Sequence, residues 1–250
     1  MAKEKVRLDK WLVSANLVAS RERARALILE GRVEVEGRRV DKPGASVQPG
    51  EKVVLIEPDH PYVSRGGVKL EGALQAFGIE PENKVAMDVG ASTGGFTHCL
   101  LLHGAREIFA VDVGYGQFAW SLRQDARIKL FERTNIRHLD RKKVPVPVDL
   151  AVVDVSFISL KTVVPAVLPF LAPGAELLCL IKPQFEVGKG RVGKGGVVRD
   201  PVLIQEVLSG IELFFQDLGI EVIGLEAAVI KGPKGNQEFF IYMKSHQSSK

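Results

Sequence analysis

Residues 87–96 read Met-Asp-Val-Gly-Ala-Ser-Thr-Gly-Gly-Phe, and this stretch decides the fold. The apolar run at 85–89 predicts a strand, and residues 96–103 predict the helix that follows it. Glycines at such a strand-to-helix turn let a ligand approach the backbone closely at the carboxyl edge of a sheet. The glycine spacing differs from the G-x-G-x-x-G of dinucleotide-binding proteins, which argues against that class.

Apolar strands alternate with helices from residue 68 onward. Further strands are expected at 108–111, 128–131, 150–153 and 177–181, with two final strands at 221–229 and 238–243. Helices are expected at 117–124, at 159–171 and from about 201 to 219, the last with Asp200 as its cap and Pro201 at its first position. Near-continuous apolar strands that alternate with helices predict an α/β domain with a mostly parallel, seven-stranded sheet covered on both faces.

The pattern D-x-G-x-x-x-G-G-F at 88–96 resembles motif I of S-adenosylmethionine-dependent methyltransferases, which have a Rossmann-like class I fold. The resemblance implies S-adenosylmethionine as cofactor and S-adenosylhomocysteine as product. Asp112 follows the second strand, where a carboxylate can accept hydrogen bonds from both ribose hydroxyls, and Asn135 is expected to meet the adenine edge. The expected cofactor-binding residues are Asp88, Gly90, Ala91, Ser92, Gly94, Gly95, Phe96, Asp112, Val113 and Asn135.

The first sixty residues form a small α+β unit of their own. Leu8, Trp11 and Leu12 share one helical face, a second helix begins near Ser20, and short strands are expected at 33–35 and 52–56. The unit resembles the S4 RNA-binding domain in the motifs R-L-D-K-W-L at 7–12, S-R-E-R-A-R-A-L-I at 20–28 and G-R-V-E-V-E-G at 31–37. The resemblance implies that this unit binds structured RNA.

Four segments are therefore expected: the S4-like unit at 1–59, a linker at 60–67, the methyltransferase domain at 68–245 and a flexible tail at 246–250. The glycine-rich stretch 188–195 nearly spells a Walker A loop, but Gly195 stands where Ser or Thr would hold Mg²⁺. We therefore expect a mobile basic loop near the substrate. The expected RNA-binding residues are Arg7, Lys10, Ser20, Arg21, Arg23, Arg25, Arg65, Lys189, Arg191 and Lys194.

Four polar residues fall at the ends of predicted elements: Lys69, Asp154, Lys182 and Glu238. In order and context they match the Lys-Asp-Lys-Glu tetrad of FtsJ-like ribose 2′-O-methyltransferases. The whole chain is similar to the TlyA family, often labelled hemolysin A, through S-R-G-G-x-K-L at 64–70, D-V-S-F-I-S-L at 154–160 and K-P-Q-F-E at 182–186. That family methylates cytidine riboses of ribosomal RNA, so the resemblance implies 16S or 23S rRNA, or ribosomal subunits, as the partner.

The tetrad suits removal of a proton from a ribose 2′-hydroxyl, which is a poor acid. A lysine acts as a base only when neutral, a state that a neighbouring cation and partial desolvation favour. We expect Lys182 to be the general base, Asp154 to orient its amine, and Lys69 to position the hydroxyl. Glu238 would hold Lys69 or the ribose. The cofactor supplies the electrophile, so no metal is expected.

Two alternatives to this enzyme are weighed against the charge, the cysteine content and the membrane signals of the chain. The formal net charge is +4, and the two cysteines, Cys99 and Cys179, fit neither a disulfide framework nor a zinc site. No signal peptide or membrane-spanning run is found, which favours a cytoplasmic protein without a membrane partner over a membrane-active hemolysin. A non-catalytic RNA-binding assembly factor stays open. The sequence does not reveal the oligomeric state, and a monomer is the default.

Overall fold

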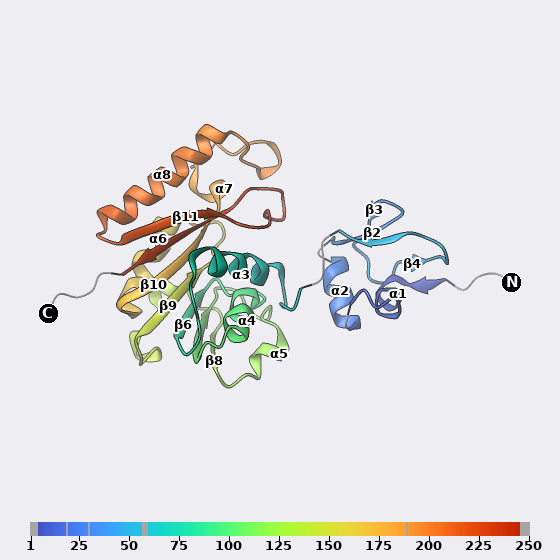
Figure 1. Ribbon diagram of the computed structural model, residues 1–250, viewed down its shortest axis with the longest axis horizontal. Helices are drawn as coiled ribbons and strands as arrows, with labels where there is room; N and C mark the ends of the chain where they lie inside the picture. Colours follow the sequence, from blue (N-terminus) through green and yellow to red (C-terminus); the bar gives the residue numbers. More distant parts are fainter. Residues whose placement is uncertain (1–4, 19, 30, 57–59, 189, 246–250) are drawn as a thin grey trace. The chain divides into compact units, whose positions relative to one another are not determined.

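The computed structural model describes residues 5–18, 20–29, 31–56, 60–188 and 190–245. The chain separates into two compact units, Met1–Pro61 and Tyr62–Lys250, which are described separately below (Figure 1). Lys189 and the expected tail at 246–250 lie outside the described residues.

The first unit packs two helices against short strands. Helices α1 (Leu8–Ser14) and α2 (Arg21–Leu29) bury Leu8, Leu12, Ala24, Leu27 and Ile28 in a common core, as the sequence pattern predicted. Ser20 caps α2, because its Oγ accepts a hydrogen bond from the backbone N–H of Arg23 at 3.1 Å. Strands β3 (Arg38–Arg39), β2 (Val33–Val35) and β5 (Val53–Leu55) form one sheet, and β1 (Val6–Arg7) pairs with β4 (Ser46–Val47).

The second unit contains the predicted seven-stranded sheet, in the order β11-β12-β10-β9-β6-β7-β8 (Figure 1). Its strands are β6 (Val85–Val89), β7 (Glu107–Val111), β8 (Ile128–Phe131), β9 (Val148–Val153), β10 (Leu171–Ile181), β11 (Glu221–Ala227) and β12 (Phe239–Lys244). Strand β12 is antiparallel to both of its neighbours, and the five strands from β10 to β8 are parallel. The fold is therefore a mostly parallel, Rossmann-like α/β sheet, as predicted.

Helices cover both faces of this sheet (Figure 1). On one face α3 (Arg65–Phe77) packs beside α4 (Gly95–Leu102) over a core that includes Leu70, Leu100 and Phe240. On the other face α6 (Leu160–Val167) and α8 (Pro201–Asp217) pack over a core that includes Val153 and Leu177 of the sheet and Phe215 of α8. The remaining helices are short: α5 (Trp120–Arg123), α7 (Pro183–Glu186) and the 3₁₀ turns Ile136–His138, Arg141–Lys143, Leu168–Phe170 and Lys194–Gly196.

Several boundaries differ from the sequence expectation. The helix expected at 159–171 ends at Val167, and a 3₁₀ turn at Leu168–Phe170 leads into β10. Residues 65–67, expected in the linker, form the first turn of α3. The side chain of Tyr62 lies where a Cβ on Gly67 would stand, so Gly67 serves close packing rather than flexibility. The helix expected at 117–124 is reduced to α5. Strand β10 begins six residues early, at Leu171, because it pairs with β9 on both sides of an irregularity at Pro173 and Gly174.

Among the described residues, no helix has the length and apolar character needed to cross a membrane.

Candidate active site

The glycine-rich turn lies at the point where the strand order reverses. From β6 the chain continues through β7 to β8 on one side, and returns through β9 to β10 on the other. The backbone N–H of Gly90 bonds the carbonyl of Val111 at 2.9 Å, and that of Asp154 bonds the carbonyl of Val89 at 2.9 Å. The turn is thereby held between the carboxyl ends of β7 and β9, where open α/β sheets bind ligands.

Gly90 is required at this turn for two reasons. Its φ is +89°, and a Cβ on it would lie 2.2 Å from the backbone oxygen of Asp154. Gly94, with φ +94°, precedes α4, and a Cβ there would lie 2.6 Å from Leu122. Both glycines therefore serve the positive φ angles and the close packing of the turn itself against Asp154 and Leu122.

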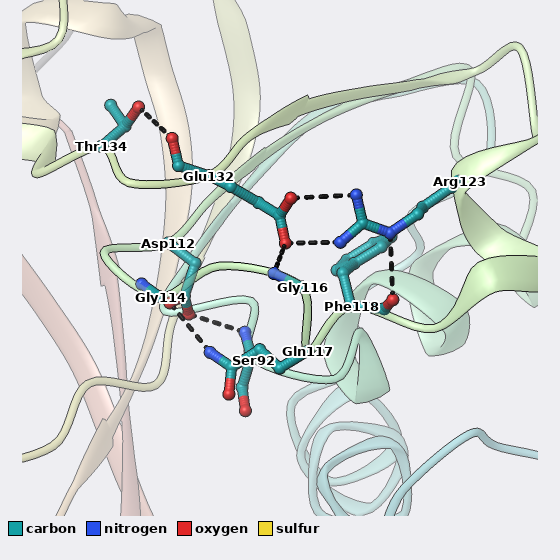
Figure 2. Close-up of polar contacts among 9 residues, drawn as sticks. All are labelled: Ser92, Asp112, Gly114, Gly116, Gln117, Phe118, Arg123, Glu132 and Thr134. Carbon is teal, nitrogen blue, oxygen red and sulfur yellow. Dashed lines mark hydrogen bonds and ion pairs between the residues drawn. The ribbon is translucent and has the colours of Figure 1, made fainter.

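Asp112 lies beside the same loop and accepts three hydrogen bonds (Figure 2). The donors are the backbone N–H of Ser92 at 2.7 Å, the backbone N–H of Gly114 at 2.6 Å and the side-chain amide of Gln117 at 3.1 Å. Two backbone donors fix the orientation of the carboxylate, which stays partly exposed. The next residue, Val113, is 71% exposed and offers an apolar surface.

Glu132 supports the segment that carries Asp112 (Figure 2). Its carboxylate forms a bidentate pair with the guanidinium of Arg123, at 2.5 and 2.9 Å, and accepts the backbone N–H of Gly116 at 2.7 Å. This pairing lowers the pKa of Glu132, chiefly through the hydrogen bond from Arg123. Sequence reasoning did not single out Glu132, since nothing local marks its contact with residue 116.

Asp88 is fully buried at the end of β6. One carboxylate oxygen accepts a hydrogen bond from the Thr97 hydroxyl at 2.6 Å, and the other has no hydrogen-bond partner among the described residues. Burial raises the pKa of Asp88 to about 7, against the opposing effect of Thr97. A buried acceptor without a partner, next to a turn that admits only glycine, fits a polar group of a bound cofactor.

Two of the expected cofactor-binding residues have other contacts. The Phe96 ring is buried and stacks on Phe240 at 6.0 Å, so its place is the core beneath the loop. The side-chain oxygen of Asn135 caps the turn Ile136–His138 by accepting the Arg137 N–H at 3.1 Å. Ala91 is buried, and Ser92 has a left-handed φ of +50°.

The four tetrad residues form two ion pairs. In the first, Nζ of Lys69, on α3, lies 2.5 Å from Oε2 of Glu238, which directly precedes β12. The side chain of Lys69 is 9% exposed and that of Glu238 is 1% exposed. Gly232 passes so close that a Cβ there would lie 2.4 Å from Glu238 Oε1. An isolated buried charge is costly, so loss of either partner would leave the other without compensation.

The second pair joins Lys182 to Asp154. Both residues directly follow strands, Lys182 after β10 and Asp154 after β9, so parallel neighbouring strands deliver them to the same edge. The Lys182 ammonium contacts the Asp154 carboxylate and also donates to the Ser156 hydroxyl at 3.1 Å. Gln184, two residues after Lys182, lies 3.5 Å from Oε1 of Glu238 and so links the two pairs.

Phe157 is an aromatic residue of this edge that the sequence analysis did not assign. It is 89% exposed and has a φ of +64°, which costs a non-glycine residue about 1 to 2 kcal/mol. Its ring lies against Phe185 at 4.9 Å. An exposed ring held in a strained conformation beside polar groups makes Phe157 a candidate binding residue. In the sequence, only its position shortly after Asp154 could have indicated this.

In the first unit, the expected RNA-binding arginines differ in their contacts. Arg7 and Arg21 each pair at 3.0 Å with Asp9, whose carboxylate is fully buried. The hydrogen bond from Arg7 is the largest cause that lowers the pKa of Asp9, to about 2. Arg23 bonds His60, while Lys10 and Arg25 are exposed. Arg21, on α2, thus also holds α1 to α2 through Asp9, while Arg7 pairs with Asp9 at the start of α1.

The second unit carries a basic segment that the sequence analysis missed. Residues 123–143 contain eight Lys or Arg and three Asp or Glu, a net charge of +5, in a chain whose formal net charge is +4. The segment contains the edge strand β8, and Arg133, Arg137 and Arg141 in it are exposed. Of the predicted RNA contacts, Arg65 donates to the carbonyl of Lys231 at 3.1 Å, and the exposed Arg191 pairs with Glu206 at 2.6 Å.

Comparison with known proteins agrees with this arrangement. Residues 62–245 match the FtsJ-like methyltransferase family and residues 6–53 match the S4 domain. The 16S/23S rRNA (cytidine-2′-O)-methyltransferase TlyA of Mycobacterium tuberculosis is 44% identical over 242 residues, 96% of this chain and 90% of that protein. This chain belongs to the TlyA family.

Two further relatives extend the match. Hemolysin A of Brachyspira hyodysenteriae is 37% identical, over 95% of this chain and 99% of its own length. A solved structure from Streptococcus thermophilus is 38% identical and superposes with a TM-score of 0.77, covering 99% of this chain and 90% of the other. The family assignment and both domain types predicted from the sequence are confirmed, and the protein is a methyltransferase by family.

Proposed function

We propose that this TlyA-family protein methylates the 2′-hydroxyl of cytidine riboses in 16S or 23S rRNA, with S-adenosylmethionine as the methyl donor. The observation that carries the proposal is the pair of lysine–carboxylate contacts at the carboxyl edge of the sheet, next to the glycine-rich turn. The name of the Mycobacterium tuberculosis relative supports the choice of cytidine and of both rRNAs.

The residues around the turn fit the cofactor. Asp112 would accept the ribose hydroxyls, Val113 would contact the adenine ring, and the unpartnered oxygen of Asp88 would meet the polar methionine end. Gly90 and Gly94 allow the positive φ angles and the close packing that hold the turn at this edge. When bound, S-adenosylmethionine supplies an electrophilic methyl group and leaves as S-adenosylhomocysteine.

Lys182 is the proposed general base. Its Nζ contacts the Asp154 carboxylate and donates a hydrogen bond to the Ser156 hydroxyl, so these two residues orient the amine, which acts as a base in its neutral form. The lone pair is then free to take the proton of the 2′-hydroxyl as its oxygen bonds to the methyl carbon. Lys69, held by Glu238, positions the ribose hydroxyl, and Phe157 offers a face on which a nucleobase can stack.

RNA contacts from both units support an rRNA substrate. The exposed Lys10 and Arg25 of the S4 unit and the basic segment at 123–143 suit a phosphate backbone. Because ribosomal RNA is the proposed substrate, we place the protein in the cytoplasm and expect ribosomal subunits as its partners.

The test uses radiolabelled S-adenosylmethionine with separate small and large ribosomal subunits. We compare wild type with Lys182→Ala and map the label to base or ribose. Lys84→Ala is the matched control, because Lys84 also pairs with a carboxylate, Glu176, but precedes β6 and so lies at the opposite edge of the sheet. We expect ribose label with wild type and Lys84→Ala and none with Lys182→Ala.

Two results would contradict the proposal. Label on a base would exclude ribose chemistry. Absence of label on both subunits, with cofactor binding intact, would favour an RNA-binding assembly factor instead.

A further inference from the structure

Two loops meet at the proposed catalytic edge and are joined at successive points along their length. One loop, residues 154–159, connects β9 to α6, and the other, residues 182–186, follows β10 and forms α7. The first contacts between the loops are the Lys182–Asp154 pair and the hydrogen bond from Lys182 to Ser156. The next is the ring contact between Phe157 and Phe185. The last contact is made by Glu186, a residue that has no role in the proposed reaction.

Glu186 uses both carboxylate oxygens to hold the start of α6. Its Oε2 accepts the hydroxyl of Ser159 at 2.6 Å, and its Oε1 accepts the backbone N–H of Leu160 at 2.8 Å. Ser159 in turn caps α6 by accepting the N–H of Lys161 at 3.1 Å. Glu186 therefore anchors the helix that ends one loop from within the other loop, and its negative charge is favourable at a helix N-terminus.

The environment of Glu186 makes this anchor costly. Burial raises the pKa of Glu186, while the hydrogen bonds from Ser159 and Leu160 lower it, as does the charge of Lys161. An exposed surface cap would carry no such penalty. The position of the carboxylate is therefore better explained by what it holds in place.

Lys182 and Asp154 both lie close to this anchor along the chain. Lys182 lies one helical turn before Glu186, across α7, where the Phe185 N–H bonds the Lys182 carbonyl at 2.9 Å. Asp154 lies five residues before Ser159, on a loop that contains Phe157 at φ +64°. A strained loop of this kind persists only where surrounding contacts over-determine it.

We propose that Glu186 is a positioning residue: through Ser159 and the N-terminus of α6 it holds the Asp154 loop against the Lys182 turn, and so sets the geometry of the Lys182–Asp154 pair. The inference rests on the proposed function of that pair. It adds a residue that touches neither the reacting groups nor the expected cofactor.

The first test is single-turnover methyl transfer with saturating S-adenosylmethionine and ribosomal subunits. We expect Glu186→Ala to lower the rate constant by about 10- to 100-fold, the effect of a displacement of about 1 Å, with cofactor affinity changed less than about twofold. Glu186→Gln should recover most of the rate, because its amide oxygen can accept the Leu160 N–H and its NH₂ can donate to Ser159.

Asp200→Ala is the matched control. Asp200 caps α8 by accepting the Val202 N–H at 2.9 Å, so its loss removes a helix cap without touching either loop. This variant should keep the wild-type rate constant. An equal rate loss in Asp200→Ala and Glu186→Ala would assign the effect to general destabilisation and overturn the proposal.

A second readout does not depend on activity. The ¹³Cε NMR signal of Lys182, assigned by its loss in Lys182→Arg, should shift in Glu186→Ala and stay unchanged in Asp200→Ala. An unchanged Lys182 signal in Glu186→Ala overturns the positioning role, whatever the rate. If wild type transfers no methyl group but the signal shifts as expected, the proposed function fails while the positioning role stands.

Discussion

The Lys69–Glu238 pair provides a stability test that is independent of the reaction. The two side chains are 9% and 1% exposed, and their charged atoms lie 2.5 Å apart. Removing one partner from such a buried pair leaves an uncompensated charge and costs about 3 to 5 kcal/mol in the free energy of unfolding. For a unit of this size the melting temperature should fall by about 6 to 20 °C.

The double variant Lys69→Met, Glu238→Gln removes both charges and should cost less than the sum of the two single variants by at least about 2 kcal/mol. The exposed pair Arg191–Glu206 is the control, since its side chains are 56% and 52% exposed and its coupling should not exceed about 1 kcal/mol. The assay is calorimetric melting of all single and double variants, with hydrogen exchange of the β12 amides to confirm which unit unfolds. Additive effects of the Lys69 and Glu238 replacements would refute the buried-pair argument.

The glycine-rich turn, Asp88 and the S4 unit can each be tested separately. Gly90→Ala should weaken S-adenosylhomocysteine binding at least about tenfold in calorimetry, because the added Cβ would push the turn away from the backbone of Asp154. Gly116→Ala, with a similar φ of +76° and no atom within 4 Å of the added Cβ, should not weaken it, and equal affinities in both variants would contradict this argument. Because burial raises the Asp88 pKa to about 7, the folded state holds a proton that the unfolded state loses above about pH 4, so stability falls as pH rises to about 7. The melting temperature of Asp88→Asn should therefore rise relative to that of wild type between pH 5 and 8. Parallel plots of melting temperature against pH would exclude a raised pKa of Asp88. Lys10→Ala with Arg25→Ala should reduce the salt dependence of RNA affinity by a slope of about 2, measured by fluorescence anisotropy, and an unchanged slope would remove these residues from the interface.

The sheet was predictable because its strands carry a strong local signal. Each parallel strand is a near-continuous apolar run, as a strand buried on both faces requires, and all seven were located from the sequence. Two-residue strands such as β1 and β4 carry no periodic signal and were missed. The early start of β10 was missed because Pro173 and Gly174 indicate a turn, a preference that pairing with β9 overrides.

The site was predictable as a set of positions but not as a set of contacts. Strand ends placed Asp154 and Lys182 at one edge, since neighbouring parallel strands end together. Lys69 and Glu238 are 169 residues apart, and only the packing of the chain brings them together. From the sequence, Glu238 was expected to hold either Lys69 or the ribose. Glu186 was quoted only as part of the motif at 182–186, because nothing local indicates that it caps α6.

Several features that cost stability lie together at the carboxyl edge of the sheet. There the chain buries the Lys69–Glu238 pair, leaves an oxygen of Asp88 without a hydrogen-bond partner among the described residues, and strains Phe157 into a left-handed conformation. Ordinary surface ion pairs, such as Arg191–Glu206, carry none of these costs because solvent screens them. At the carboxyl edge the usual rules on buried charge, hydrogen bonding and backbone conformation are broken together, while the strands that lead to it obey them. Selection for a ligand and a reaction explains this better than packing does. This concentration of costs supports the proposal that the tetrad serves a reaction.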